Sequence, residues 1–200
     1  MYKKQMVFQR IVCFLAVIAA ALTFAYSLGL VTDLYDGLYW TNNKVKGAEI
    51  FYDIQPFNKQ LTYVGIGLLL LAAVLFLTQT HARRKYYIGN YVSTGLFSVG
   101  AVAAAVWSFV QIHGAGGYKY QFLNNLDFDA LATRATKYKQ TYIDSTFWFD
   151  VQYVLAAILI ITAVLLVVNV IMKKKVMASE DALISEGASA VRTDIDDSKK

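Results

Sequence analysis

The chain has 200 residues, of which 57% are hydrophobic and only 16% charged, and this composition is too apolar for a soluble domain of that size. The formal net charge is +5, yet none of the 19 basic and 14 acidic side chains falls within the four long apolar runs of the sequence. A charge at the bilayer centre costs about 2.5–3.5 kcal/mol, and about 20 apolar residues span the hydrocarbon core. We therefore predict an all-α membrane protein, a four-transmembrane-helix bundle formed by residues 1–175. The spans are expected at residues 11–32, 61–79, 91–112 and 151–172.

Basic residues bracket these spans unevenly. Three precede the first span, three separate the second from the third, and three follow the fourth, so alternation of the spans places all nine on one side: Lys3, Lys4, Arg10, Arg83, Arg84, Lys85, Lys173, Lys174 and Lys175. The other side has seven basic residues, which are spread over loops 33–60 and 113–150 and balanced by eight acidic ones. The positive-inside rule then predicts that both termini are cytoplasmic and both long loops extracellular. We expect the basic clusters to contact anionic lipid headgroups and not nucleic acid.

The first span is expected to stay in the membrane, because its apolar run is longer than the roughly 7–15 residues of a secretory signal. It contains Cys13, the only cysteine, so neither external loop can hold a disulfide. This argues against the eukaryotic four-span families with cysteine-bonded outer loops. We therefore expect a multi-pass protein of the bacterial plasma membrane.

The first external loop, residues 33–60, is rich in aromatic side chains and turn signals. Its stretch 48–54 alternates loosely between apolar and polar residues, which suggests a short strand. Pro56, the only proline, is expected to end that element before the second span begins.

The second external loop, residues 113–150, starts with a glycine-rich segment, 113–117, that is expected to be a flexible exit from the third span. Apolar and aromatic residues then recur at helical spacing and predict an amphipathic helix, with Asp127 or Asp129 as its N-cap. The residues that define this helix are Leu131, Ala135, Tyr138 and Tyr142. Packed on the first loop, it would complete a small extracellular cap. After the fourth span, residues 176–200 turn small, polar and acidic, and we expect a disordered cytoplasmic tail.

The aromatic residues of the two loops allow three interpretations. Trp40, Tyr63, Trp148 and Phe149 lie where an interfacial aromatic belt is expected. The remaining rings can form the small core of the cap, or they can form an exposed face for a partner protein or a sugar ring, because tyrosine and tryptophan are large, rigid and half polar. The candidates for recognition are Tyr39, Trp40, Phe51, Tyr52, Tyr138 and Tyr142.

Small residues form stripes on two spans. Gly100, Ala104 and Ser108 repeat every four residues in the third span, and Ala16 and Ala20 have the same spacing in the first. Such stripes let helix backbones approach closely. They can serve packing inside this bundle, or they can bind a helix of another protein.

The sequence offers little for chemistry. Its two histidines, His81 and His113, are expected at opposite faces of the membrane, so they cannot share a haem. The predicted spans contain no ionisable residue for transport, and the external loops lack a preorganised nucleophile and base. We predict a protein that is not an enzyme and that has no catalytic residues, cofactor or metal.

Three stretches carry a family resemblance: 47–58 (GAEIFYDIQPFN), 83–88 (RRKYYI) and 145–150 (STFWFD). They resemble a little-characterised family of four-span proteins in Gram-positive bacteria that tends to accompany carbohydrate ABC importers. The resemblance implies a partner protein and no enzyme, and it supplies no functional residues.

The leading hypothesis is therefore a non-catalytic accessory subunit of a multi-subunit bacterial membrane complex, with a carbohydrate ABC importer as the complex that the resemblance implies. Its partners would be other integral membrane subunits, such as ABC permeases, and an extracellular substrate-binding protein. One alternative is a stand-alone envelope protein that binds a lipid or glycan through its aromatic outer loops. Another is a small homo-oligomeric channel.

Overall fold

The computed structural model describes residues 2–41, 44–79, 87–135 and 144–197. Over these ranges the chain is almost entirely helical and forms no strand. The helices are α1 (Tyr2–Thr41), α2 (Glu49–Asp53), α3 (Gln55–Gln79), α4 (Tyr87–His113), α5 (Tyr118–Asn125), α6 (Phe128–Ala135) and α7 (Phe147–Asp197).

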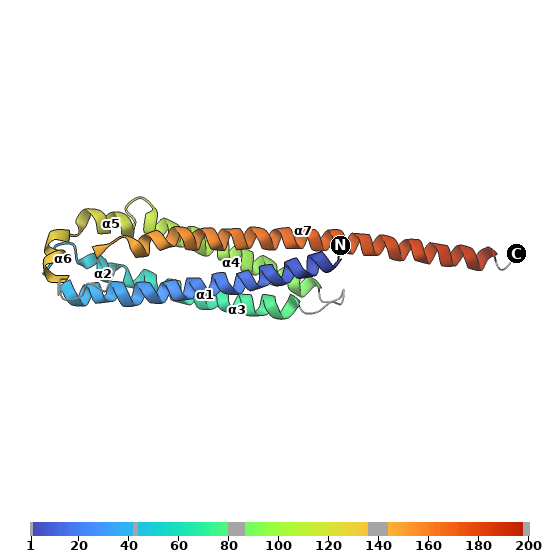
Figure 1. Ribbon diagram of the computed structural model, residues 1–200, viewed down its shortest axis with the longest axis horizontal. Helices are drawn as coiled ribbons and strands as arrows, with labels where there is room; N and C mark the ends of the chain where they lie inside the picture. Colours follow the sequence, from blue (N-terminus) through green and yellow to red (C-terminus); the bar gives the residue numbers. More distant parts are fainter. Residues whose placement is uncertain (1, 42–43, 80–86, 136–143, 198–200) are drawn as a thin grey trace.

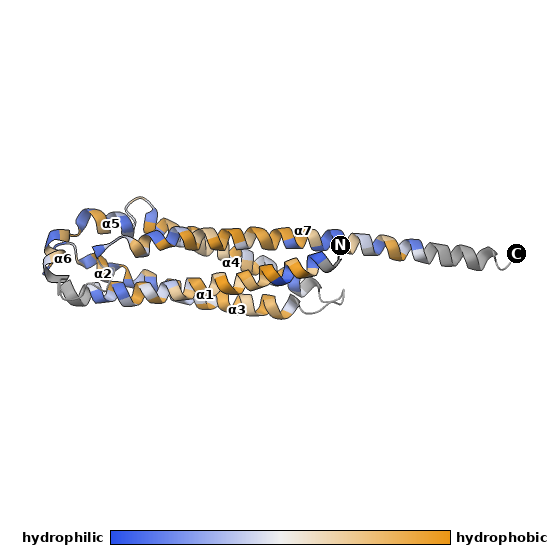
Figure 2. Ribbon diagram, viewed as in Figure 1, coloured by the Kyte–Doolittle hydropathy of each residue, from blue (hydrophilic) through white to orange (hydrophobic). Residues whose placement is uncertain are grey.

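Helices α1, α3, α4 and α7 are long and apolar enough to cross a membrane, and they lie side by side in an elongated bundle (Figure 1). Apolar residues fill the middle of the bundle, and hydrophilic residues gather towards its two ends (Figure 2). The chain is therefore a multi-pass membrane protein with the four predicted spans, each of which extends past its predicted limits. We call the end where α2, α5 and α6 lie the loop end, and the end near the N-terminus the terminal end.

Each long helix packs against two others: α1 contacts α3 and α7, and α4 contacts α3 and α7. The contact between α3 and α4 agrees with the prediction that the second and third spans are neighbours, although most of their connection, residues 80–86, lies outside the described residues. Helices α1 and α3 approach each other closely at a glycine of α3. A Cβ atom added to Gly65 would lie 2.9 Å from the Cα atom of Phe24 on α1, so glycine is required at this crossing.

The stretch 48–54 is helical, and the predicted strand is wrong. Its buried residues are Ala48, Ile50, Phe51 and Ile54, and the spacing of Ala48, Phe51 and Ile54 is that of a helix face. Gly47 has a positive φ of 80°, which turns the chain into α2. Pro56 was expected to end this element, but α2 already ends at Asp53 and α3 begins at Gln55. Pro56 lies in the first turn of α3, where its missing N–H costs no hydrogen bond.

The loop end has a small aromatic core. The ring of Phe122 on α5 lies between 5.1 and 6.2 Å from the rings of Phe51 on α2, Phe128 on α6 and Phe149 on α7. The chain reaches α5 through a short turn, 114–117, where the sequence predicts only a flexible exit. We did not predict α5, because its aromatic residues show no strong pattern of their own: Phe122 is buried, whereas Tyr120 is 60% exposed.

Helix α6 is the first half of the predicted amphipathic helix. Asp127 is its N-cap, as one of the two expected candidates, and its carboxylate accepts a hydrogen bond of 3.0 Å from the backbone N–H of Ala130. The backbone N–H of Asp127 donates in turn to the carbonyl of Lys46, also at 3.0 Å, and so joins the two loops. Residues 136–143, which include Tyr138 and Tyr142, lie outside the described residues.

Helix α7 continues to Asp197, well past the bundle (Figure 1), where we expected a disordered tail from residue 176 onward. The physical reason is composition: residues 176–197 include four alanines, a single glycine, Gly187, and no proline to end the helix. The described side chains between residues 181 and 187 are exposed, so no packing against the bundle supports this extension.

Candidate functional site

The predicted small-residue stripes lie inside the bundle. Ala16 and Ala20 on α1 and Ala104 and Ser108 on α4 are buried among the chain's own helices. A Cβ atom at Gly100 would make ordinary contacts of 3.5 and 3.6 Å with two leucine side chains of α3. Four of the five stripe residues therefore pack inside the bundle, and the fifth, Gly100, lies beside α3.

The predicted recognition aromatics are divided by the structure. Tyr52 is 64% exposed at the loop end, whereas its neighbour Phe51 is 1% exposed and belongs to the aromatic core. Tyr39 and Trp40 lie in the last turns of α1, and their side chains are outside the described residues, as are Tyr138 and Tyr142 altogether. Among the described candidates, only Tyr52 presents a ring to the surroundings.

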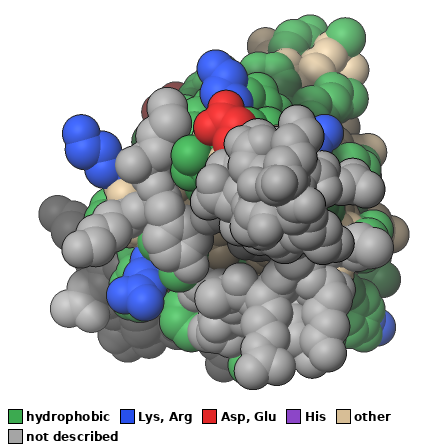
Figure 3. Space-filling view, turned by 90° about the vertical axis from the view of Figure 1, so that its right-hand side faces the viewer, with side chains coloured by type: hydrophobic (Ala, Val, Ile, Leu, Met, Phe, Trp, Pro, Cys, Tyr) green, Lys and Arg blue, Asp and Glu red, His purple; other side chains and the backbone are tan. Residues whose placement is uncertain are grey.

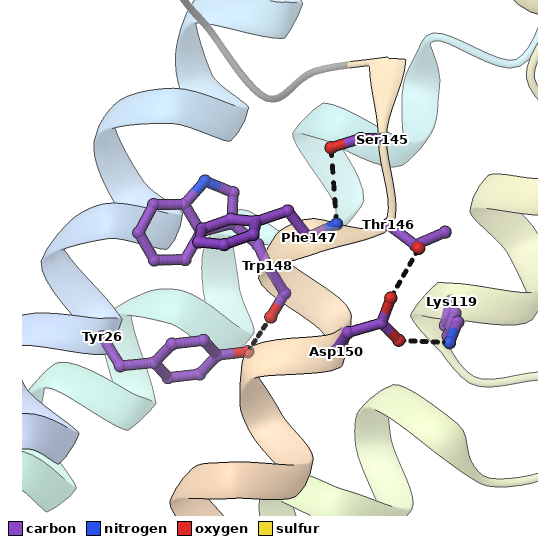
Figure 4. A network of polar contacts seen from close by, with 7 residues as sticks. All are labelled: Tyr26, Lys119, Ser145, Thr146, Phe147, Trp148 and Asp150. Atoms are coloured by element: carbon purple, nitrogen blue, oxygen red, sulfur yellow. Dashed lines mark hydrogen bonds and ion pairs between the residues drawn. The ribbon is translucent and has the colours of Figure 1, made fainter.

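Trp148 connects the start of α7 to α1. Its ring packs directly on Gly29, where any Cβ atom would overlap it, and its indole N–H donates to the carboxylate of Asp33 at 2.9 Å. The hydroxyl of Tyr26 donates to the backbone carbonyl of Trp148 at 2.7 Å (Figure 4). Trp148 was expected as an interfacial aromatic residue, and the structure adds its structural role.

The next turn of α7 is held to α5. The ammonium of Lys119 forms an ion pair with Asp150 at 2.5 Å, and the hydroxyl of Thr146 donates to the same carboxylate at 2.6 Å (Figure 4). His113, at the end of α4, stacks on Tyr153 with ring centroids 3.9 Å apart. These contacts fix the loop end against the spans, and they bring no nucleophile to a base.

A buried polar cluster that the sequence did not reveal lies at the terminal end. The ammonium of Lys173 on α7 donates to the side-chain carbonyl of Asn90 on α4 at 2.7 Å, and Gln5 on α1 donates to Asn169 on α7 at 3.1 Å. All four residues are buried. Lys173 was interpreted only as a topology charge, because sequence alone does not show which side of a helix faces its neighbours. The cluster joins three spans by interhelical hydrogen bonds.

A groove with a volume of about 690 Å³ lies between α4 and α7. Its lining is Ser98, Val99, Val102, Ala103 and Val106 from α4 and Ala163, Val164, Val167 and Val168 from α7. Every lining residue falls within a predicted span, so the groove opens at membrane depth. We call it the α4–α7 groove. No sequence pattern predicts the groove, because no residue in it is unusual by itself.

Ser98 is the polar member of this lining, and it is only 9% exposed. One turn earlier on α4, Thr94 is 3% exposed. Neither hydroxyl has a hydrogen-bond partner within the described part of the chain.

Two other depressions differ in character. A smaller apolar one of about 260 Å³ lies between α1 and α7 beside Tyr26 and Trp148. A polar one of about 660 Å³ lies at the loop end, and its lining includes Lys46, Glu49 and Asn125. Within the described ranges, no group of three or more histidine, cysteine, aspartate or glutamate side chains is placed to hold a metal ion.

No protein-family model, no curated protein and no solved structure matches this chain. The class of the protein, a multi-pass membrane protein with four spanning helices, therefore rests on its own sequence and fold.

Proposed function

We propose that this protein is a non-catalytic subunit of a larger membrane assembly, in which it packs sideways against another integral membrane protein. The observation that carries the proposal is the α4–α7 groove. It is an apolar groove with a volume of about 690 Å³ at membrane depth, and in an isolated bundle lipid would fill it. Exposed apolar surface itself is ordinary in a bilayer, so the argument depends on the concave shape and on the small side chains that line it.

We further propose that the terminal end is cytoplasmic and the loop end extracellular, in a bacterial plasma membrane. The described side chains of Lys4, Arg10, Lys174 and Lys175 are exposed near the terminal end, and lysine and arginine side chains stand around the rim in the view onto that end (Figure 3). This distribution supports the orientation through the positive-inside rule. The helices of the loop end would then form the extracellular cap, with α2, α5 and α6 joined by their aromatic core.

The resemblance to proteins that accompany carbohydrate ABC importers supports one kind of assembly, a nutrient importer. In that arrangement, the groove would receive a span of a permease subunit. The extracellular cap would face the side from which a substrate-binding protein delivers its cargo, and the exposed ring of Tyr52 is a candidate contact for it.

The test is to extract the tagged full chain from its native membrane in a mild detergent and to quantify the co-purifying proteins by mass spectrometry. The informative variant is Val99→Trp, which fills the groove, and the matched control is Leu70→Trp on the outward face of α3. Both changes keep the surface apolar. We expect stoichiometric membrane partners with the wild type and Leu70→Trp and a large loss with Val99→Trp. Recovery of the chain alone and monodisperse would refute the proposal.

A second candidate function is that of a stand-alone envelope protein that binds a glycan at the loop end. The observation in its favour is the polar depression of about 660 Å³, which has the size of a small-molecule site. Saturable binding of a sugar to the purified chain, lost in Asn125→Ala or Glu49→Gln, would support this function. Conductance of the purified chain in liposomes would instead favour a homo-oligomeric channel.

A further inference from the structure

The part of α7 that extends past the bundle continues the helix face that packs inside the bundle (Figure 1). Seven residues make about two turns of an α-helix, so residues seven apart lie on one line of its surface. Two such lines are buried or half-buried within the bundle: Leu155, Thr162, Asn169 and Val176, and Ala156, Ala163, Val170 and Met177. The next members of these lines are Leu183 and Ile184, which are 68% and 61% exposed. The face that α1 and α4 cover inside the bundle therefore continues, still apolar, beyond them.

This continued face is a flat apolar patch on an otherwise polar stretch of helix. Gly187 lies between the two lines, and a Cβ atom there would meet nothing within 4 Å, so another backbone can come close to the patch. Ala182 and Ser185 lie on the opposite side of the helix and are also exposed. We call the patch formed by Leu183, Ile184 and Gly187 the arm face.

The arm face lies too far from the spans for lipid to cover it. The predicted fourth span ends at residue 172, and Lys174 and Lys175 are exposed where the headgroups begin. Ile184 follows Lys175 by nine residues, which is about 14 Å along the helix axis. The headgroup region of one leaflet is only about 5–7.5 Å thick. Leu183 and Ile184 therefore expose their side chains to water.

A second copy of the chain cannot cover the arm face either. The patch is on the side of α7 that packs against α1 and α4, so it points beneath its own bundle. A second α7 seated on it in the same membrane would continue upward into the space that α1 and α4 occupy, because α7 is one continuous helix (Figure 1). The occupant therefore has to be a soluble polypeptide that reaches the terminal end from the aqueous phase.

The charge of the extension specifies the chemistry of this polypeptide. Residues 176–197 contain six acidic side chains and one basic one: Glu180, Asp181, Glu186, Asp194, Asp196 and Asp197, and Arg192. A segment with this charge repels nucleic acid and anionic headgroups and attracts a basic surface. An apolar patch on an acidic helix matches an amphipathic helix whose polar side is basic.

We infer that the arm face binds a basic amphipathic helix of a soluble protein. Apolar side chains of that helix cover Leu183 and Ile184, and its lysine or arginine side chains lie near the acidic residues of the extension. This inference goes beyond the proposed function, because it concerns the aqueous phase at the terminal end and does not depend on the α4–α7 groove. Under the proposed orientation, the partner is cytoplasmic.

The first test places the photoreactive amino acid p-benzoylphenylalanine at Ile184, with Ala182 on the opposite side as the control position, in the full chain in its native membrane. We expect an adduct from Ile184 and not from Ala182. The cross-linked peptide, identified by mass spectrometry, should be a basic amphipathic segment of a soluble protein. Adducts to lipid, to a second copy or to an acidic or uncharged segment, equal yields from both positions, or no adduct at all would each overturn the inference.

The second test uses a defined probe, a synthetic helical peptide of leucine and lysine in heptad spacing, and the full chain in nanodiscs of phosphatidylcholine. Ile184→Asp should weaken binding roughly tenfold, as expected for a central apolar contact, and Ala182→Asp should not weaken it. Both changes add one negative charge, but only the first alters the arm face. A peptide with glutamate in place of lysine should not bind. Equal affinity for the two variants, or equal binding to empty nanodiscs, would contradict the inference.

The two partners can be tested separately. Ile184→Asp leaves the α4–α7 groove untouched, so recovery of a membrane partner should not change in this variant. A membrane partner recovered without any adduct from Ile184 would refute the arm face as a binding site and leave the proposed function intact. An adduct to a basic helix without any membrane partner would refute only the proposed function.

Discussion

The close approach of α1 and α3 at Gly65 gives a quantitative prediction for Gly65→Ala. The new Cβ atom would lie 2.9 Å from the Cα atom of Phe24, and ordinary contact begins at 3.4 Å, so the helices must part by the difference, 0.5 Å. The neighbouring group is backbone and cannot rotate away. Overpacking of this kind costs about 1–3 kcal/mol, and alanine recovers at most about 1 kcal/mol over glycine in helix propensity. The expected net result is a loss of roughly 1–2 kcal/mol in the free energy of unfolding.

Gly67 is a matched control two residues further along α3, because a Cβ atom there would meet nothing within 4 Å. Gly67→Ala should therefore leave stability unchanged or raise it by up to about 1 kcal/mol. The assay is reversible unfolding of the purified protein in mixed micelles of mild detergent and dodecyl sulfate, followed by circular dichroism. Equal stability of the two variants would show that the α1–α3 crossing is looser than described, and the argument from the glycine would be refuted.

Three further changes test the loop end and the buried polar cluster. Phe51→Ala removes a buried ring and should cost about 3–5 kcal/mol, whereas Tyr52→Ala at the exposed neighbour should cost less than about 0.5 kcal/mol, as measured by thermal unfolding. Asp127→Ala removes the N-cap of α6 and should cost about 1 kcal/mol, with faster hydrogen exchange confined to that helix. Asn90→Ala removes the acceptor that lies 2.7 Å from the buried Lys173 ammonium, and it should lower the free energy of unfolding by about 1–3 kcal/mol. The control is Asn124→Ala, which should have little effect because Asn124 is exposed.

The four spans could be predicted because charge and length are sufficient for them. A charged or unpaired polar group is unfavourable in hydrocarbon whichever side of the helix it occupies. The limits of each span can therefore be read from composition. The N-cap of α6 was also predictable, because Asp127 acts on a backbone N–H only three residues away. In both cases the deciding interaction lies within the segment itself or with the solvent around it.

Several of the errors have a common cause in contacts between segments, whereas the helical extension of α7 reflects its own composition. Residues 48–54 form a helix because Phe51 is buried against Phe122, which is 71 positions further along the chain, and α5 exists within the same contact. Lys173 has the sequence signature of a topology charge, but its side chain turns inward to Asn90. The stripes of Ala16 and Gly100 were compatible with internal packing and with partner binding, and the structure places Ala16 inside the bundle and Gly100 beside α3.

The sequence by itself therefore predicted the four membrane-spanning helices, because desolvation depends on composition along the chain. Only the tertiary structure decided which small residues pack inside the bundle and which valines line an open groove. Those outcomes depend on how each helix is rotated about its axis, and that rotation is fixed by packing against neighbours that are distant in sequence.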